Sequence, residues 1–174
     1  YSSNVYFYEV GGGYKDLVGL GISRIENYFR KFGFGKPVEG ELFSDLAGTI
    51  PNPDWKRKVF NDDWRLGDTY FTSIGQYGTQ VTPLQVVRAY SAIANRGTLI
   101  DPKIIADPAQ PIVSSKIEGI DGWVWDTIHL AMRDTVLFGT SKGLNYPDFD
   151  IAGKTGTAEL CVSKENVNSR AVGY

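Results

Sequence analysis

The sequence predicts an α+β domain, an α/β sandwich in which an antiparallel sheet packs between helices. Apolar residues recur at helical spacing in the segments 16–32, 82–95 and 121–138. A glycine-rich stretch, 151–159, instead alternates with the period of a strand, and a second extended stretch, 170–174, follows it in hairpin order. The predicted helices at 82–95 and 121–138 are the natural candidates to cover the sheet.

Composition bounds the class of protein. With 174 residues, 42% of them hydrophobic, the chain can bury the core of one domain. A formal charge of -2 lacks the basic footprint of a nucleic-acid binder, so we expect no nucleic-acid partner. The lone cysteine, Cys161, excludes an internal disulfide framework, and with the single histidine it argues against a zinc site. We therefore expect no metal and no cofactor.

No window of the sequence approaches the roughly 20 apolar residues of a membrane span. The first residue is Tyr1 rather than Met, and polar motif residues follow at once. We expect the chain to be the interior of a longer protein, with any anchor or export signal outside it.

The first half of the chain predicts two helices and a long loop. Capping residues, Ser2 or Ser3, begin a short helix that the glycines at 11–13 end. A longer helix covers 16–32 and ends at the glycine and proline of 33–37. Prolines and scattered aromatic residues in 36–75 indicate a long ordered loop packed over a surface.

The clearest local signal is Thr82-Pro83-Leu84-Gln85, because Thr can cap a helix, Pro suits its first position and Gln can complete a capping box. The helix that begins there has a narrow polar stripe and is otherwise apolar, which indicates that it is mostly buried. The stripe contains Gln85, Arg88, Ser91 and Asn95. Residues 98–100 and 103–105 then read as a short extended pair.

The helix at 121–138 is predicted to bury one apolar face. That face carries Trp125, Ile128, Met132 and Val136. His129 falls on another face, so we expect a solvated surface residue rather than a catalytic base.

The stretch 151–159 combines a cation, Lys154, with hydroxyls at Thr155 and Thr157. Its glycines favour an edge strand that another backbone approaches, and the polar groups suit a carboxylate, so we infer a peptide-binding edge with an anion pocket. Gly153-Lys154-Thr155 could also end a phosphate-binding loop, but that pattern requires glycine where Asp148 stands, so a phosphate loop is excluded. A plain exposed hairpin strand remains an alternative from these residues alone.

Two polar clusters together point to a family. Ser2-Ser3-Asn4 at a helix start and Lys154-Thr155-Gly156 on a strand, in this order, resemble the second and third motifs of the penicilloyl-serine transferases. Six further segments resemble the transpeptidase domain of class B penicillin-binding proteins, so that the resemblance covers nearly all of the chain. They are Phe32-Gly33-Phe34-Gly35-Lys36-Pro37, Pro53-Asp54-Trp55-Lys56-Arg57-Lys58, Gly67-Asp68-Thr69, Ser73-Ile74-Gly75-Gln76, Val81-Thr82-Pro83-Leu84-Gln85 and Ala94-Asn95-Arg96-Gly97.

The segments around Lys56 and Asp68 are more similar to the elongation type, penicillin-binding protein 2, than to the septal type. The chain departs from the family in three places. No Ser is followed three residues later by Lys, so we expect the family's nucleophile upstream of Tyr1; Tyr77 stands where the family usually has glycine; and the last strand is cut at Tyr174. The expectation is thus one partial transpeptidase domain over 1–174, with an incomplete penicillin-binding/β-lactamase-like fold.

The resemblance implies a D,D-transpeptidase that crosslinks peptidoglycan stem peptides ending in D-Ala-D-Ala during cell-wall elongation. A serine forms an acyl-enzyme and an amine resolves it, and β-lactams inhibit the reaction. The implied location is the extracytoplasmic face of the bacterial cytoplasmic membrane. The implied partners are a membrane glycan polymerase and other proteins of the elongation machinery.

The resemblance also implies residue roles. Ser2 would relay a proton, Asn4 would bind a side-chain amide of the acyl donor, and Lys154 would sit against Ser2 and raise the positive potential there. Thr155 and Thr157 would bind the donor's carboxylate, and the backbone N–H of Thr157 would form half of an oxyanion hole. Gly156 would let the strand approach.

Two other functions stay open. A D,D-carboxypeptidase or serine β-lactamase of the same fold would resolve the acyl-enzyme with water. A non-catalytic penicillin-binding sensor or scaffold domain would not crosslink at all. Because residues 1–174 offer no nucleophile of the family type, we expect them alone not to be labelled by a fluorescent penicillin.

Overall fold

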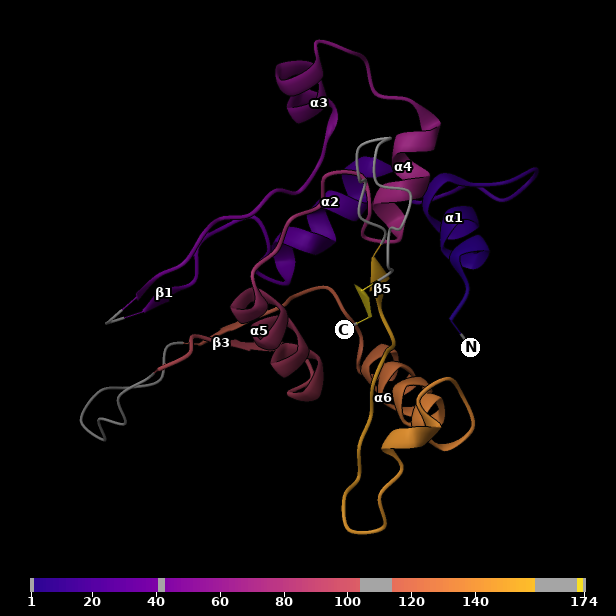
Figure 1. Ribbon diagram of the computed structural model, residues 1–174, viewed down its shortest axis with the longest axis vertical. Helices are drawn as coiled ribbons and strands as arrows, with labels where there is room; N and C mark the ends of the chain where they lie inside the picture. Colours follow the sequence, from indigo (N-terminus) through magenta and orange to yellow (C-terminus); the bar gives the residue numbers. More distant parts are fainter. Residues whose placement is uncertain (1, 41–42, 104–113, 159–171, 174) are drawn as a thin grey trace.

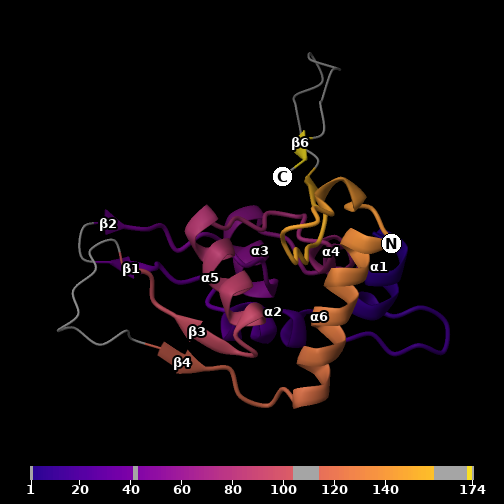
Figure 2. The same ribbon diagram turned by 90° about the horizontal axis from the view of Figure 1, so that it is seen from below.

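The computed structural model describes residues 2–40, 43–103, 114–158 and 172–173, which form helices and short antiparallel strand pairs (Figures 1 and 2). The helices are α1 (Asn4–Gly12), α2 (Ile22–Lys31), α3 (Pro53–Phe60), α4 (Leu66–Ser73), α5 (Pro83–Ala94), α6 (Gly122–Leu137) and the 3-10 turn η1 (Lys142–Leu144). The strands are β1 (Glu39–Gly40), β2 (Phe43–Ser44), β3 (Thr98–Ile100), β4 (Ser114–Lys116), β5 (Thr157–Ala158) and β6 (Val172–Gly173). This confirms the predicted α+β class.

α1 begins and ends where the sequence indicates. Ser3 is its N-cap, accepting a hydrogen bond from the Tyr6 N–H, and Gly13 follows its last turn with φ 87°. The helix packs against α4 (Figure 1), and a Cβ on Gly11 would collide with Ser73. The glycines of 11–13 therefore both end the helix and allow the close approach of α4.

The prediction of a helix from Asp16 was wrong in its first turns, because α2 begins at Ile22. The chain between α1 and α2 instead folds back along the end of α1, where Leu20 N–H donates to Val10 C=O and Gly21 N–H to Gly11 C=O, both at 2.9 Å. Gly21 has φ 75°, a conformation that side chains disfavour. These contacts use backbone groups that a continuous helix would need.

The segment 36–75, predicted as a long loop, contains the β1–β2 hairpin and the helices α3 and α4. α3 starts with Asn52 as N-cap, whose side chain accepts a hydrogen bond from Trp55 N–H at 2.8 Å, and with Pro53 at its first position. Both helices have only eight residues, so their apolar periodicity is short. The described residues of this segment therefore form helices and strands, and the prediction of a loop was wrong.

α5 has the predicted start and end, with Thr82 and Gln85 forming the capping box and Asn95 at the C-cap. The prediction that this helix is mostly buried was wrong, because apolar residues on it are exposed, while its polar stripe runs from buried Gln85 to exposed Asn95. Gln85 is 1% exposed, whereas Val87 on the same helix is 61% exposed. The Gln85 amide reaches the backbone carbonyls of 36, 46 and 47 at 2.7 to 3.2 Å, so the polar side chain fixes a neighbouring segment.

β3 pairs with β4, and the predicted extended stretch 103–105 lies mostly outside the described residues, which end here at 103. The pair lies beside α5 (Figure 2). A buried cluster of Ala92, Leu99 and Ile117 joins helix and strands, and Phe32 of the α2 C-cap packs against it. This cluster is the hydrophobic core between α5, the β3–β4 pair and the end of α2.

α6 covers the predicted range and buries Trp125 and Val136, while Ile128 and Met132 are half-buried. The prediction for His129 was wrong in one respect. Its ring is partly buried, and Nε2 lies 2.7 Å from the carbonyl oxygen of Ile93 in α5. Because a carbonyl only accepts, Nε2 carries the hydrogen, and the residue links the two helices.

β5 and β6 are antiparallel, with Thr157 opposite Gly173 and Ala158 opposite Val172. This confirms the predicted hairpin order at these positions. Residues 159–171, between the two strands, lie outside the described residues. The described strands form two-stranded pairs, and the predicted single packed sheet is not seen within them.

Candidate active site

The two polar clusters at opposite ends of the chain meet. Lys154 Nζ donates a hydrogen bond to Ser2 Oγ at 2.9 Å, across 152 positions of sequence, and a second to its neighbour's carbonyl, Thr155 O, at 2.6 Å. The predicted contact between Lys154 and Ser2 is therefore present. Lys154 is exposed, and among the described residues no carboxylate lies within ion-pair distance of it.

The start of α1 positions the first cluster. Ser3 takes the capping role, so Ser2 lies just before the helix and Asn4 is its first residue. All three are exposed. A helix start with its free N–H groups and two exposed polar side chains is suited to bind polar or anionic parts of a ligand.

α6 positions the second cluster. Gly153 N–H donates to Met132 C=O at 3.1 Å, and Arg133 donates to Ile151 C=O at 2.8 Å. Arg133 also pairs with Asp150 at 3.1 Å. These contacts hold the backbone on both sides of Ala152 against the helix, so Lys154 projects from a fixed support.

The predicted strand from Ile151 was therefore too long. Of its described residues, 151–158, only Thr157 and Ala158 make ladder bonds, because backbone groups of Ile151 and Gly153 bond to α6 instead. The exposure still alternates along 151–156, half-buried and then exposed, as the period of an extended segment predicts. The predicted alternation is therefore present, and the paired part of the strand is shorter than predicted.

The remaining predicted site residues lie next to Lys154 along the chain. Gly156 and Thr157 are exposed, and Thr157 opens β5. Thr155 is half-buried, and its Oγ1 lies 3.3 Å from Oγ1 of Thr140, a residue that sequence reasoning did not single out. The geometry thus adds a third hydroxyl, from the segment after α6, to the cluster.

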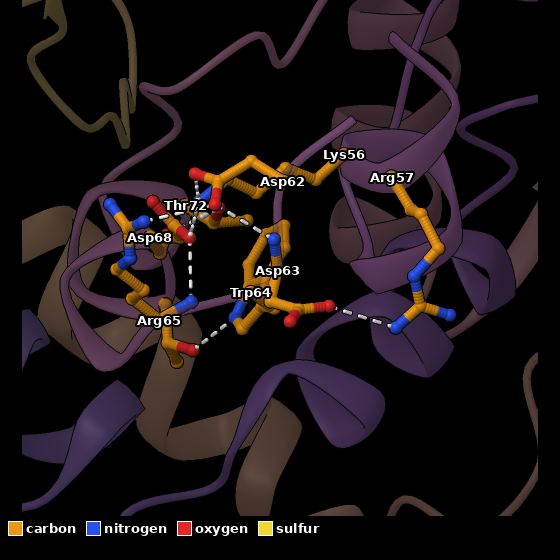
Figure 3. Close-up of polar contacts among 9 residues, drawn as sticks. Lys56, Arg57, Asp62, Asp63, Trp64, Arg65, Asp68 and Thr72 are labelled. Carbon is orange, nitrogen blue, oxygen red and sulfur yellow. Dashed lines mark hydrogen bonds and ion pairs between the residues drawn. The ribbon is translucent and has the colours of Figure 1, made fainter. Parts of the chain in front are cut away.

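A buried charge cluster joins the two segments that resemble the elongation type (Figure 3). Lys56 of α3 is 4% exposed and its Nζ lies 2.7 Å from Asp68 of α4 and 3.1 Å from Asp62. Asp68 also accepts the Arg65 N–H at 2.7 Å, which caps α4. This Lys56 cluster (Lys56, Asp62, Asp68) fixes α3 to α4 and was not predicted.

The pKa values in the Lys56 cluster follow from these contacts. The hydrogen bond to Asp68 raises the pKa of Lys56 far above its ordinary value, even though burial acts against the charge. For Asp68 burial acts against ionisation, but the hydrogen bonds from Lys56 and Arg65 N–H outweigh it and lower the pKa. The hydrogen bond from Lys56 likewise lowers the pKa of Asp62. All three groups are charged at neutral pH.

α4 transmits this support to the site. Ser73 Oγ donates to Phe7 C=O and Tyr70 OH to Gly13 C=O, each at 2.9 Å, so α4 holds α1 at two places. The Lys56 cluster is thus linked to α1 through α4, and it touches neither Ser2 nor Asn4. Its role here is structural.

Within the described ranges, no group of three or more metal-ligating side chains occurs. A search of the same residues finds no helix with the length and apolarity to cross a membrane.

The geometry agrees with comparisons to known proteins. The chain is similar to the peptidoglycan D,D-transpeptidase MrdA of Acinetobacter baumannii, with 34% identity over 81% of this chain and 22% of that protein. It is also similar to Pseudomonas aeruginosa PBP2, solved in complex with WCK 5153, with TM-score 0.77, 31% identity, and coverage of 90% of this chain and 36% of that one.

A third likeness is to Helicobacter pylori PBP2, solved in complex with MreC, with TM-score 0.76, 30% identity, and coverage of 90% and 28%. The chain thus spans about a quarter to a third of the proteins it resembles. The family model for the penicillin binding protein transpeptidase domain matches residues 1–174, and the chain belongs to that family.

Proposed function

We propose that the protein is a peptidoglycan D,D-transpeptidase that crosslinks stem peptides through a serine acyl-enzyme during cell-wall elongation, and that residues 1–174 are part of its single transpeptidase domain. The observation that carries the proposal is the 2.9 Å contact between Lys154 Nζ and Ser2 Oγ. It brings the second and third motifs of the family together within a chain that the family model matches throughout.

The contact suits Ser2 to proton transfer. The Lys154 ammonium has only donors, so Ser2 Oγ accepts its hydrogen bond and keeps its own hydrogen to donate elsewhere. A fixed positive charge beside this oxygen also favours the state in which the hydroxyl has given up its proton. Ser2 would relay a proton between the nucleophile and the leaving amine. The nucleophile would come from a Ser-x-x-Lys sequence, which residues 1–174 do not contain.

The neighbouring residues would hold the acyl donor. Thr155 and Thr157 would donate to its terminal carboxylate, and the exposed Lys154 would add an attractive charge. The backbone N–H of Thr157 would stabilise the oxyanion, Gly156 would let the substrate backbone approach, and Asn4 would bind an amide of the donor.

The partners and location of the whole protein are inferred from its relatives. We infer that it acts on stem peptides ending in D-Ala-D-Ala, that β-lactams acylate it, and that it works at the extracytoplasmic face of the cytoplasmic membrane. Partners in the elongation machinery are supported by the solved complex of Helicobacter pylori PBP2 with MreC, and a glycan polymerase by a solved peptidoglycan synthase complex that coordinates polymerization with crosslinking. No cofactor is needed for this chemistry.

Two pairs of variants test the site in the full-length protein. Lys154→Ala should slow acylation by a fluorescent penicillin at least about a hundredfold, the usual cost of removing one preorganised electrostatic group. Lys58→Ala, at an exposed lysine of α3, is the matched control and should leave the rate unchanged. Ser2→Ala should also slow acylation, whereas Ser3→Ala should weaken only the helix cap, by about 1 kcal/mol.

The reaction itself separates the transpeptidase from its rivals. With a stem-peptide donor and an amine acceptor, the full-length protein should form the crosslinked dimer. Rapid release of hydrolysed penicillin would instead indicate a carboxypeptidase or β-lactamase, and absence of both products would indicate a sensor or scaffold. Residues 1–174 alone should take no penicillin label.

A further inference from the structure

Thr140 lies beside the candidate carboxylate site, although it belongs to neither motif. Its Oγ1 is 3.3 Å from Thr155 Oγ1. Thr140 is exposed and comes from the segment between α6 and η1, 15 positions before Thr155.

The end of α6 fixes the backbone around Thr140. Phe138 N–H and Gly139 N–H both donate to Asp134 C=O, at 2.8 and 3.1 Å, and Ser141 N–H donates to Thr135 C=O at 3.0 Å. A Cβ on Gly139 would lie 2.9 Å from the Cα of Thr135, so only glycine fits this close turn. Thr140 therefore extends from a position that the helix end defines.

Thr155 rests on the same helix. The hydrogen bond from Gly153 N–H to Met132 C=O joins the segment before β5, which contains Thr155, to α6. Lys154 holds the Thr155 carbonyl at 2.6 Å. The two hydroxyls are thus placed relative to one another by a common support, and their contact does not depend on a flexible loop.

The chemistry of the pair sets a direction. A threonine hydroxyl has one hydrogen to donate and two lone pairs that accept. When Thr155 gives its hydrogen to an anion, it can keep the contact with Thr140 only by accepting, and Thr140 must then donate. A hydroxyl that already accepts a hydrogen bond is oriented and is a better donor, because chains of hydrogen bonds polarise one another.

We propose that Thr140 is a positioning residue for carboxylate recognition: its hydroxyl donates to Thr155 Oγ1 and so directs the Thr155 hydrogen toward the terminal carboxylate of the donor peptide. The inference rests on the proposed function, since it deepens the role given there to Thr155. Thr140 acts through Thr155 and does not contact the substrate.

The test measures equilibrium binding to the full-length protein, so that it does not depend on turnover. The probes are a peptide ending in D-Ala-D-Ala and the same peptide with a C-terminal amide. Thr140→Val removes the hydroxyl at nearly constant shape and should weaken binding of the acid about five- to tenfold, with little change for the amide. Thr140→Ser should restore binding. The control variant, Thr127→Val, removes an exposed hydroxyl within α6 that donates to Trp123 C=O. It should change the affinity for neither peptide.

Each outcome decides the proposal. Equal weakening for acid and amide, or failure of Thr140→Ser to restore the acid, would reduce Thr140 to a structural part of the helix end and overturn it. A wild-type protein that binds acid and amide equally has no carboxylate site for Thr140 to serve, which overturns it too. A protein that prefers the acid, loses that preference in Thr140→Val and yet is never acylated supports Thr140 and contradicts the transpeptidase function.

Discussion

Asp68→Asn should loosen the link between α3 and α4, because it removes the main counter-charge of a lysine that is 4% exposed. Breaking a buried ion pair from one side costs about 3–5 kcal/mol. Asp62 remains 3.1 Å from Lys56 and retains part of the attraction, so the lower end, about 3 kcal/mol, is the expected loss for Asp68→Asn.

Hydrogen–deuterium exchange of the full-length protein measures this loss where it occurs. A loss of about 3 kcal/mol corresponds to about a hundredfold faster exchange of the amides in α3 and α4, if these open as a unit. Asp63→Asn is the matched control, because Asp63 and its partner Arg57 are both exposed and such pairs contribute little. Equal exchange in Asp68→Asn and Asp63→Asn would refute the argument that burial makes this cluster strong.

The same cluster predicts a pH dependence. The pKa values of Asp62 and Asp68 are lower in the folded protein than their ordinary value of 3.8. The unfolded chain then binds more protons in the acid range, so their contribution is complete above pH 3.8 and is lost as the pH falls through the folded-state values. Thermal melts below pH 4 should therefore show a steeper loss of stability in wild type than in Asp68→Asn.

Four other substitutions test the packing of the helices. Gly19→Ala should destabilise the protein by about 1–3 kcal/mol, since a Cβ there would collide with the backbone at the end of α1. Gly67→Ala, on the open surface of α4, should instead stabilise it by about 0.5–1 kcal/mol. Melting curves measure both changes. Gln85→Met should cost at least about 2 kcal/mol in the same assay, because three partly buried backbone carbonyls lose their donor. His129→Ala should cost about 1 kcal/mol by removing a hydrogen bond to α5, yet leave penicillin acylation unchanged; loss of acylation would make His129 more than a link between helices.

The sequence predicted those elements whose ends carry local chemistry. Thr82 and Pro83 mark the start of α5, and the capping box is present there. Asn52 and Pro53 are a start signal of the same kind for α3, but the helix is too short for its apolar spacing to confirm the signal. The start of α2 was predicted too early for a different reason. The apolar spacing before Ile22 is helical, but Gly19 and Gly21 interrupt it.

The candidate site was predictable only as far as its motifs extend. The contact of Lys154 with Ser2 followed from the family resemblance, because no local rule relates residues this far apart. Thr140 could not be found, since nothing in the sequence places the end of α6 beside Thr155. The burial of Gln85 and the partner of His129 depend in the same way on which elements pack together.

The contact between Ser2 and Lys154 also has a consequence for how the protein is made. Closing a loop of 152 residues costs on the order of 4 kcal/mol in chain entropy, which one hydrogen bond cannot supply. The pair can form only after the helices between its members have packed. During synthesis, Ser2 leaves the ribosome about 150 residues before Lys154, so this part of the site assembles late, and a nascent chain cannot hold the pair before its intervening helices exist.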